Sequence, residues 1–131
     1  MLEKILCIDD DPITLMLCKM VITKALFSNE IATAKNGEEA LKYYDTLKTT
    51  STIKKPQLIF LDLNMPVMNG WEFLDSFVTA EYSEYHDTKV IILSSTIDPQ
   101  DLEKSKKYPM VIDFLSKPIS KEMLEFLKDK I

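Results

Sequence analysis

Short apolar segments alternate with helix-patterned segments along the chain, and this alternation limits the possible folds more than any other feature. The run Leu58–Leu61, for example, is of the kind that lies buried inside a parallel sheet. We predict strands at Lys4–Ile8, Glu30–Ala34, Leu58–Leu61, Lys89–Leu93 and Val111–Leu115. We predict helices at Pro12–Leu26, Gly37–Leu47, Gly70–Ala80, Asp98–Lys107 and Lys121–Lys130. This order of elements predicts an α/β domain around a parallel sheet.

Capping residues mark several of the predicted helix starts. Asp11 precedes a proline, Asn36 precedes Gly37 and two glutamates, and Ser120 precedes the last helix. Two polar segments, Lys48–Lys55 and Tyr82–Thr88, are predicted to be loops, and the first of them is expected to be mobile.

Length and charge fit one globular domain over residues 1–131. The chain is 46% hydrophobic and 28% charged, and its apolar stretches fall short of the roughly 20 residues of a membrane span. The start, MLEKILCIDDDP, carries acids where a secretory signal has its cleavage site, so we expect a cytoplasmic protein. The net charge of −5 argues against direct binding to nucleic acid and favours a partner protein, and no contact with a membrane is expected.

Several other residues are interpreted as structural. Cys7 and Cys18 fall in apolar segments without CxxC spacing, so we predict buried thiols rather than a metal site or a disulfide framework. His86 is predicted to be a surface residue and not a phosphate acceptor. The apolar residues of the first helix that we predict to pack in the core are Ile13, Met16, Leu17, Met20 and Val21.

Polar residues follow four of the predicted strands at the point where each strand ends. They are Asp9–Asp11 after the first strand, Asp62 after the third, Ser94–Thr96 after the fourth and Lys117 after the fifth. Because right-handed crossovers bring these strand ends to one edge of the sheet, we expect the side chains to meet there. Each of them alone is more often structural, but their joint placement favours a functional site.

Carboxylates gathered at such an edge predict a bound cation. Two carboxylates about 4 Å apart repel each other by about 4 kcal/mol at an effective dielectric near 20. Oxygen ligands without His or Cys suit Mg²⁺ or Mn²⁺. With the ammonium group of Lys117 and the hydroxyl of Ser94, they are the groups needed to accept a phosphoryl group, with Asp62 as the nucleophile.

The sequence resembles the receiver domain of two-component response regulators, with the stand-alone chemotaxis-type regulators as its nearest analogues. The motifs that carry the resemblance are the acidic pair within Ile8–Pro12, the run Asp62–Gly70, Ser94, Phe114 and Lys117–Pro118, and the similarity covers essentially the whole chain. It implies a single flavodoxin-like (βα)5 doubly wound sandwich with a five-stranded parallel sheet in the order 2-1-3-4-5.

The resemblance also implies how the site works. Asp62 would accept phosphate from a histidine kinase or a histidine phosphotransfer protein. Mg²⁺, with Mn²⁺ as a substitute, would be bound by the side chains of Asp10 and Asp62 and the backbone carbonyl of Asn64, with Asp9 contributing directly or through water. Lys117 would pair with the phosphoryl oxygens, and the bond between Lys117 and Pro118 would be cis.

Ser94 and Phe114 would form the switch. Ser94 stands where threonine is commoner in the family, and Phe114 lacks the phenolic hydroxyl of many switch aromatics. Movement of Ser94 toward the phosphate would let Phe114 follow and change the face formed by the fourth helix, the last strand and the last helix. We therefore expect a signalling domain that controls an effector protein, as a monomer or a phosphorylation-dependent dimer, with no enzymatic activity beyond its own phosphorylation and dephosphorylation.

Parts of the sequence fit three alternative functions. A Mg²⁺-dependent aspartyl phosphatase usually has a second acid two residues after its nucleophile, and position 64 is Asn. A flavodoxin-like cofactor binder needs a glycine-rich phosphate loop, and Gly37 and Gly70 are the only glycines. A receiver used only for docking, without phosphorylation, remains the third alternative.

Overall fold

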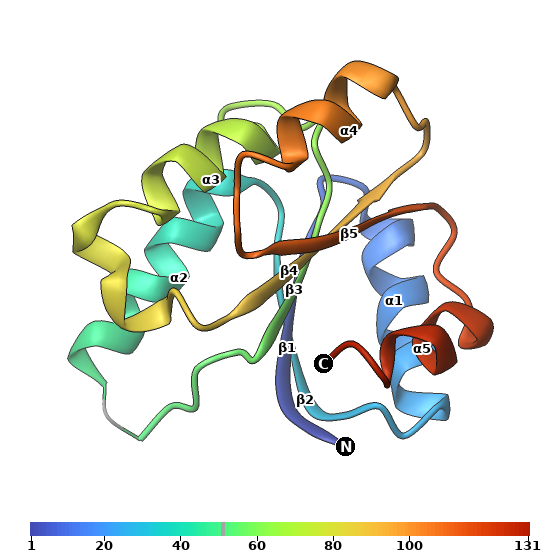
Figure 1. The fold of residues 1–131 in the computed structure, drawn as a ribbon. Coiled ribbons are helices and arrows are strands. Elements are labelled where there is room, and N and C mark those ends of the chain that lie inside the picture. Colours follow the sequence, from blue (N-terminus) through green and yellow to red (C-terminus); the bar gives the residue numbers. More distant parts are fainter. Residues whose placement is uncertain (51) are drawn as a thin grey trace.

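The computed structural model describes residues 1–50 and 52–131 and contains one five-stranded sheet (Figure 1). Its strands are β1 (Leu2–Ile8), β2 (Ser28–Ala34), β3 (Leu58–Leu61), β4 (Lys89–Ser94) and β5 (Val111–Ser116). All neighbouring strands are parallel, and the order is β2-β1-β3-β4-β5. The predicted α/β fold and strand order are therefore confirmed.

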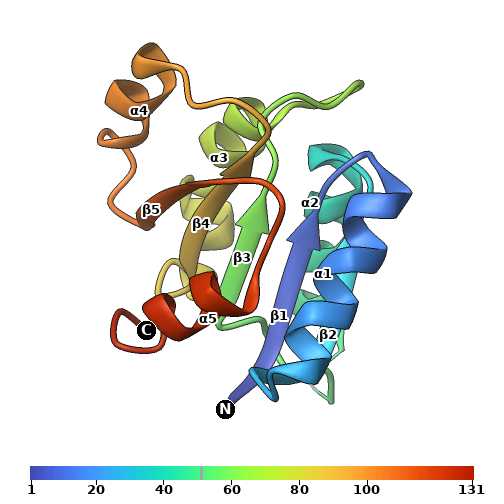
Figure 2. The same ribbon diagram turned by 90° about the vertical axis from the view of Figure 1, so that its right-hand side faces the viewer.

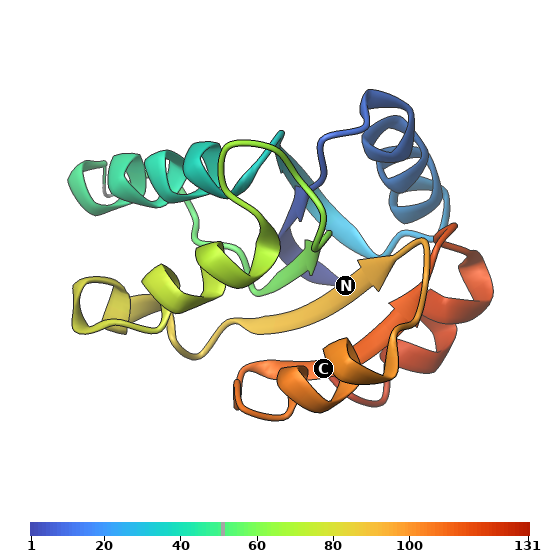
Figure 3. The same cartoon turned by 90° about the horizontal axis from the view of Figure 1, so that it is seen from above.

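Helices cover both faces of the sheet. They are α1 (Pro12–Lys24), α2 (Gly37–Thr49), α3 (Gly70–Phe77), α4 (Pro99–Ser105) and α5 (Lys121–Leu127). Viewed from above, α1 and α5 lie together on one side of the sheet, and α2 and α3 lie on the other (Figure 3). In the side view of Figure 2, α4 stands at the upper end of the molecule near β5.

The sheet divides the hydrophobic core into two parts because side chains alternate along each strand. In β1, Ile5 and Cys7 face the α1 and α5 side, whereas Leu6 and Ile8 face the α2 and α3 side. Strands β1, β3 and β4 are the central strands of the sheet, so their carboxyl ends come out of the core next to one another.

The helix ends differ from the prediction by a few residues. The first helix ends at Lys24 rather than residue 26, because Leu26 has a positive φ of 53° and cannot continue it. The last helix ends at Leu127 rather than Lys130. The segment Lys48–Lys55 was predicted to be a loop, but α2 extends through Thr49; residue 51 lies outside the described residues.

The segment between α3 and β4 is more ordered than the predicted loop Tyr82–Thr88. α3 ends at Phe77, and a 3-10 helix, η1 (Ala80–Tyr85), follows it. This helix buries Tyr82 and Tyr85 against Phe77, and aromatic packing of this kind fixes the connection. His86 is exposed, as predicted, although its Nε2 lies 2.7 Å from the carbonyl oxygen of Phe77.

The prediction that the apolar stripe of α1 packs in the core was wrong for four of its five residues. Exposed fractions are 62% for Ile13, 53% for Met16, 38% for Leu17 and 46% for Met20, whereas Val21 is partly buried. This helix is apolar on most of its circumference, and only the face that contains Cys18 and Ile22 packs against the sheet and α5. Cys7 and Cys18 are both buried, as predicted.

Within residues 1–50 and 52–131, the helices are too short or too polar to span a membrane.

Candidate functional site

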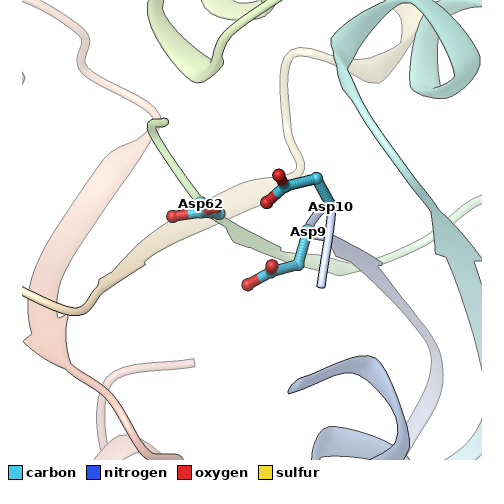
Figure 4. Close-up of side chains that lie close together, drawn as sticks. All are labelled: Asp9, Asp10 and Asp62. Atoms are coloured by element: carbon cyan, nitrogen blue, oxygen red, sulfur yellow. The ribbon is translucent and has the colours of Figure 1, made fainter. Parts of the chain in front are cut away.

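Three carboxylates meet at the carboxyl ends of β1 and β3 (Figure 4). Asp9 and Asp62 each continue the pairing of the sheet by one residue, since their backbone N–H groups donate to the carbonyl oxygens of Ala34 and Ile8 at 3.0 and 2.9 Å. Asp10 follows in the turn that leads to α1. One carboxylate oxygen from each of Asp9, Asp10 and Asp62 lies within 4.8 Å of the others.

Lys117 reaches the same cluster from the end of β5. Its backbone N–H donates to the carbonyl oxygen of Ser94 at 2.7 Å, and its peptide bond to Pro118 is cis. Its Nζ lies 2.6 Å from Asp9 Oδ2 and 3.4 Å from Asp62 Oδ1. The structure therefore brings together the acids of β1 and β3 and the lysine of β5, as the parallel topology predicted.

Burial and neighbouring charges shift the pKa values of Asp62 and Lys117 in this cluster. Asp62 is 6% exposed. Burial, followed by repulsion from Asp9, raises the pKa of Asp62 to about 6, although Lys117 acts in the opposite direction. Burial lowers the pKa of Lys117, but its hydrogen bond to Asp9 and the nearby carboxylates outweigh this effect and raise that pKa above its usual value.

The donor set of the cluster fits a hard divalent cation. Three carboxylates lie around one point, and oxygen ligands of this type suit Mg²⁺. The negative charges of two buried acids, Asp9 and Asp62, are only partly offset by the ammonium group of Lys117. Asn64 lies in the exposed turn that follows Asp62, and the role of its backbone carbonyl as a ligand stays a prediction.

Ser94 and Phe114 lie on the opposite side of Asp62 from the acids of β1. Ser94 is 2% exposed, and its Oγ accepts a hydrogen bond from the backbone N–H of Thr96 at 3.4 Å. Phe114 is 9% exposed and packs with Leu63 and Ile92. Both side chains are therefore buried, and their switching role stays a prediction.

The loop between β3 and α3 is held in a tight conformation that sequence reasoning did not identify. Val67 has φ of 71°, and the N–H of Met68 donates to the carbonyl of Pro66, which makes a tight turn centred on Val67. A Cβ added to Gly70 would lie 2.6 Å from the backbone oxygen of Asp62. The sequence feature that could have indicated this close packing is the scarcity of glycine. A chain with only two glycines is expected to place them where a side chain does not fit.

A family model for the response regulator receiver domain matches residues 5–127. The chain belongs to this family. Receiver domains act in two-component signalling, and the family resemblance found in the sequence is thereby confirmed.

Solved structures and a curated relative agree with this assignment. A two-component response regulator from Cytophaga hutchinsonii has a TM-score of 0.88 and 31% identity, covering 98% of this chain and 96% of that one. The chemotaxis protein CheY4 of Vibrio cholerae has a TM-score of 0.80 and 26% identity, with full coverage of both chains (100% each).

The curated relative is a much longer protein. It is a protein-glutamate methylesterase/protein-glutamine glutaminase of Bacillus subtilis (strain 168), 32% identical over 133 residues. The match covers 97% of this receiver domain but 32% of that protein, so the chain spans about a third of the length of the relative.

Proposed function

We propose that this receiver domain, residues 1–131, is a phosphoacceptor switch in which Asp62 receives a phosphoryl group from a phosphohistidine. The proposal depends chiefly on one observation: the buried Asp62 carboxylate lies at the sheet edge with Lys117 Nζ 3.4 Å away and with Asp9 and Asp10 beside it. A nucleophile, a cation-binding acid pair and an ammonium group thus converge on one point.

In the proposed reaction, an Asp62 carboxylate oxygen attacks phosphorus in line with the bond to the donor imidazole. The new P–O bond forms as the P–N bond breaks, and the imidazole leaves with the bonding pair and takes a proton from solvent. Because its pKa is about 6, Asp62 is mostly ionised at pH 7 and able to attack. Lys117 is positioned to contact a phosphoryl oxygen and to stabilise the charge that develops on it.

Asp9, Asp10, Asp62 and the backbone carbonyl of Asn64 would hold Mg²⁺, with Mn²⁺ as a substitute. The bound ion would neutralise charge on the phosphoryl oxygens. Adding Mg²⁺ should raise the melting temperature of the protein, because ligands that bind the folded state stabilise it. Asp10→Ala should abolish this rise, whereas Asp11→Ala, which changes a neighbouring acid that caps α1, should retain it.

The proposed output is a change of the surface formed by α4, β5 and α5. A phosphoryl group adds about −1.5 to −2 charge beside Ser94 and Lys117. Ser94 would turn toward it, and Phe114 would move into the space that is vacated. The altered surface would bind an effector protein or a second receiver domain, and no direct contact with nucleic acid or membrane is proposed.

The phosphodonor we propose is a histidine kinase or a histidine phosphotransfer protein. Apolar side chains are exposed around the acidic cluster: Ile13 and Met16 on α1, Val67 after β3 and Ile97 after β4 are between 48% and 72% exposed. Exposed apolar groups beside a reactive site are suited to docking of a partner protein.

The proposed location of the protein is the cytoplasm, where such a phosphodonor would act. The free thiols of Cys7 and Cys18 fit a reducing compartment.

Incubation with Mg²⁺ and acetyl phosphate tests the proposal. Intact-mass measurement should show addition of one phosphoryl group to the wild-type protein and none to Asp62→Asn. A docking module without phosphorylation would give no addition to either protein, and an aspartyl phosphatase would release phosphate continuously from small esters.

A further inference from the structure

We propose that Trp71 and Tyr108 form a clamp between α3 and α4 that holds the receiver domain in its unphosphorylated conformation and so sets how readily Asp62 is phosphorylated. This inference rests on the proposed function and concerns its regulation. The clamp is defined by Trp71 at the start of α3, by Asp101 and Lys104 on α4, and by Tyr108 and its partner Asp75.

The helix α4 has little apolar contact with the rest of the molecule. It is seven residues long, and Ser105 is its buried residue. The apolar residues at and before this helix, Leu102 and Ile97, are 37% and 48% exposed. A helix packed in this way depends on contacts between its polar side chains and the residues around it.

Those contacts converge on Trp71. Its indole N–H donates to Asp101 Oδ1 at 3.3 Å, and Lys104 Nζ lies 4.9 Å from the centre of a Trp71 ring. The ring of Tyr108 stacks on Trp71, with a centroid distance of 5.5 Å and an interplanar angle of 24°. Trp71 on α3 therefore contacts two residues of α4, Asp101 and Lys104, and one residue after α4, Tyr108.

Tyr108 ties the same segment to α3 a second time. Its hydroxyl donates to Asp75 Oδ1 on α3, and its carbonyl accepts from the N–H of Val111 at the start of β5. The connection from α4 to β5 is thus fixed to α3 at both Trp71 and Asp75.

The clamp also contacts the proposed switch. Trp71 and Val111 pack against the cluster formed by Leu63, Ile92 and Phe114. Movement of Phe114 would change the surface on which Trp71 rests, and movement of α4 would separate Asp101 and Lys104 from Trp71. Opening the clamp is therefore coupled to the same rearrangement that phosphorylation of Asp62 is proposed to drive.

Linkage gives the sign of the effect. In the proposed scheme these contacts exist only in the unphosphorylated conformation and therefore oppose phosphorylation, so weakening them should favour the phosphorylated conformation. An aromatic pair of this kind corresponds to about a threefold to tenfold change in an equilibrium constant. Tyr108→Leu should thus bind the phosphoryl mimic beryllofluoride, in the presence of Mg²⁺, about three to ten times more tightly than the wild type.

The test measures beryllofluoride affinity and acrylamide quenching of Trp71, which is the only tryptophan in the sequence. In the wild type, beryllofluoride should make Trp71 more accessible to acrylamide. In Tyr108→Leu, Trp71 should be accessible before the mimic is added.

Lys104→Met should strengthen beryllofluoride binding about twofold, because a cation–π contact is weaker than the stack. Lys107→Met makes the same chemical change beside α4, outside the clamp, and should have no effect.

The outcomes separate the clamp from the proposed function. If the wild type does not bind beryllofluoride, the phosphoacceptor assignment fails and the regulatory role of the clamp fails with it. If the wild type binds the mimic but Tyr108→Leu and Lys104→Met bind it with unchanged affinity, or if quenching of wild-type Trp71 does not rise, the clamp is refuted and the phosphoacceptor assignment stands.

Discussion

Lys117 forms a closer ion pair with Asp9 than with Asp62: its Nζ lies 2.6 Å from Asp9 Oδ2 and 3.4 Å from Asp62 Oδ1. Lys117 is therefore paired mainly with Asp9, and the pKa of the buried Asp62 stays raised, at about 6. A cation bound among the carboxylates would compete with Lys117 for Asp9 and leave the lysine nearer to the proposed phosphorylation site.

Removing the charge of Asp9 should therefore lower the pKa of Asp62. In Asp9→Asn, Lys117 loses its main partner and is expected to pair with Asp62, while the repulsion between the two carboxylates disappears. Both changes favour the ionised form of Asp62. A carboxyl-detected NMR titration of the metal-free protein should show a pKa clearly below 6. Glu38→Gln, a change on the exposed face of α2, should leave it unchanged; an unaltered titration in Asp9→Asn would refute this account of the pKa.

Asp62→Asn should stabilise the metal-free protein at neutral pH. The pKa of Asp62 is about 6 in the folded protein and 3.8 in an exposed chain, so the folded state binds this proton more tightly. Protonated Asp62 therefore adds to the free energy of unfolding below about pH 4. This contribution, about 1 to 3 kcal/mol, is lost as the pH rises through about 6.

Urea unfolding of both proteins from pH 4 to pH 8 measures this effect. The difference in unfolding free energy between Asp62→Asn and wild type should grow from pH 4 to pH 7 and then level off. A pH-independent difference would show that Asp62 does not titrate in this range. Mg²⁺ should reduce the difference, because it stabilises the ionised wild-type site.

Gly70→Ala should destabilise the protein by about 1 to 3 kcal/mol, because overpacking against backbone is poorly relieved. The added Cβ would lie 2.6 Å from the carbonyl oxygen of Asp62 and 3.0 Å from Cα of Leu63. Gly37→Ala is a useful comparison, since two of its three nearest atoms belong to the flexible side chain of Met68. Chemical denaturation should rank Gly70→Ala as the more damaging change, and the reverse order would contradict the packing described for the β3–α3 loop.

Val67→Asn should stabilise the protein by about 1 kcal/mol. A β-branched residue is strained at a positive φ, and Asn tolerates this conformation better. Val67 is 72% exposed, so little apolar contact is lost. Val78, which has φ of −82° and is 40% exposed, is the matched control, and Val78→Asn should give no gain. Equal effects of the two substitutions in urea unfolding would mean that the strain at Val67 is not significant.

The order of strands and helices, and the meeting of acids and lysine at one sheet edge, could be predicted from the sequence. Apolar runs such as Leu58–Leu61 specify strands through local periodicity, and capping residues such as Asp11 and Asn36 specify helix starts. Parallel topology then places Asp9, Asp62 and Lys117 at the same edge, without any knowledge of detailed packing.

Features that depend on contacts between distant segments could not be predicted in this way. The apolar circumference of α1 did not reveal which face is buried, because that choice is made by the sheet and α5. The partition of Lys117 between two carboxylates depends on a small difference between two distances, 2.6 and 3.4 Å, and the stacking of Trp71 on Tyr108 depends on packing between side chains far apart in sequence. Local patterns fix the elements and their order, since they act through neighbouring residues, whereas only the packed tertiary structure decides which of several chemically equivalent partners each side chain contacts.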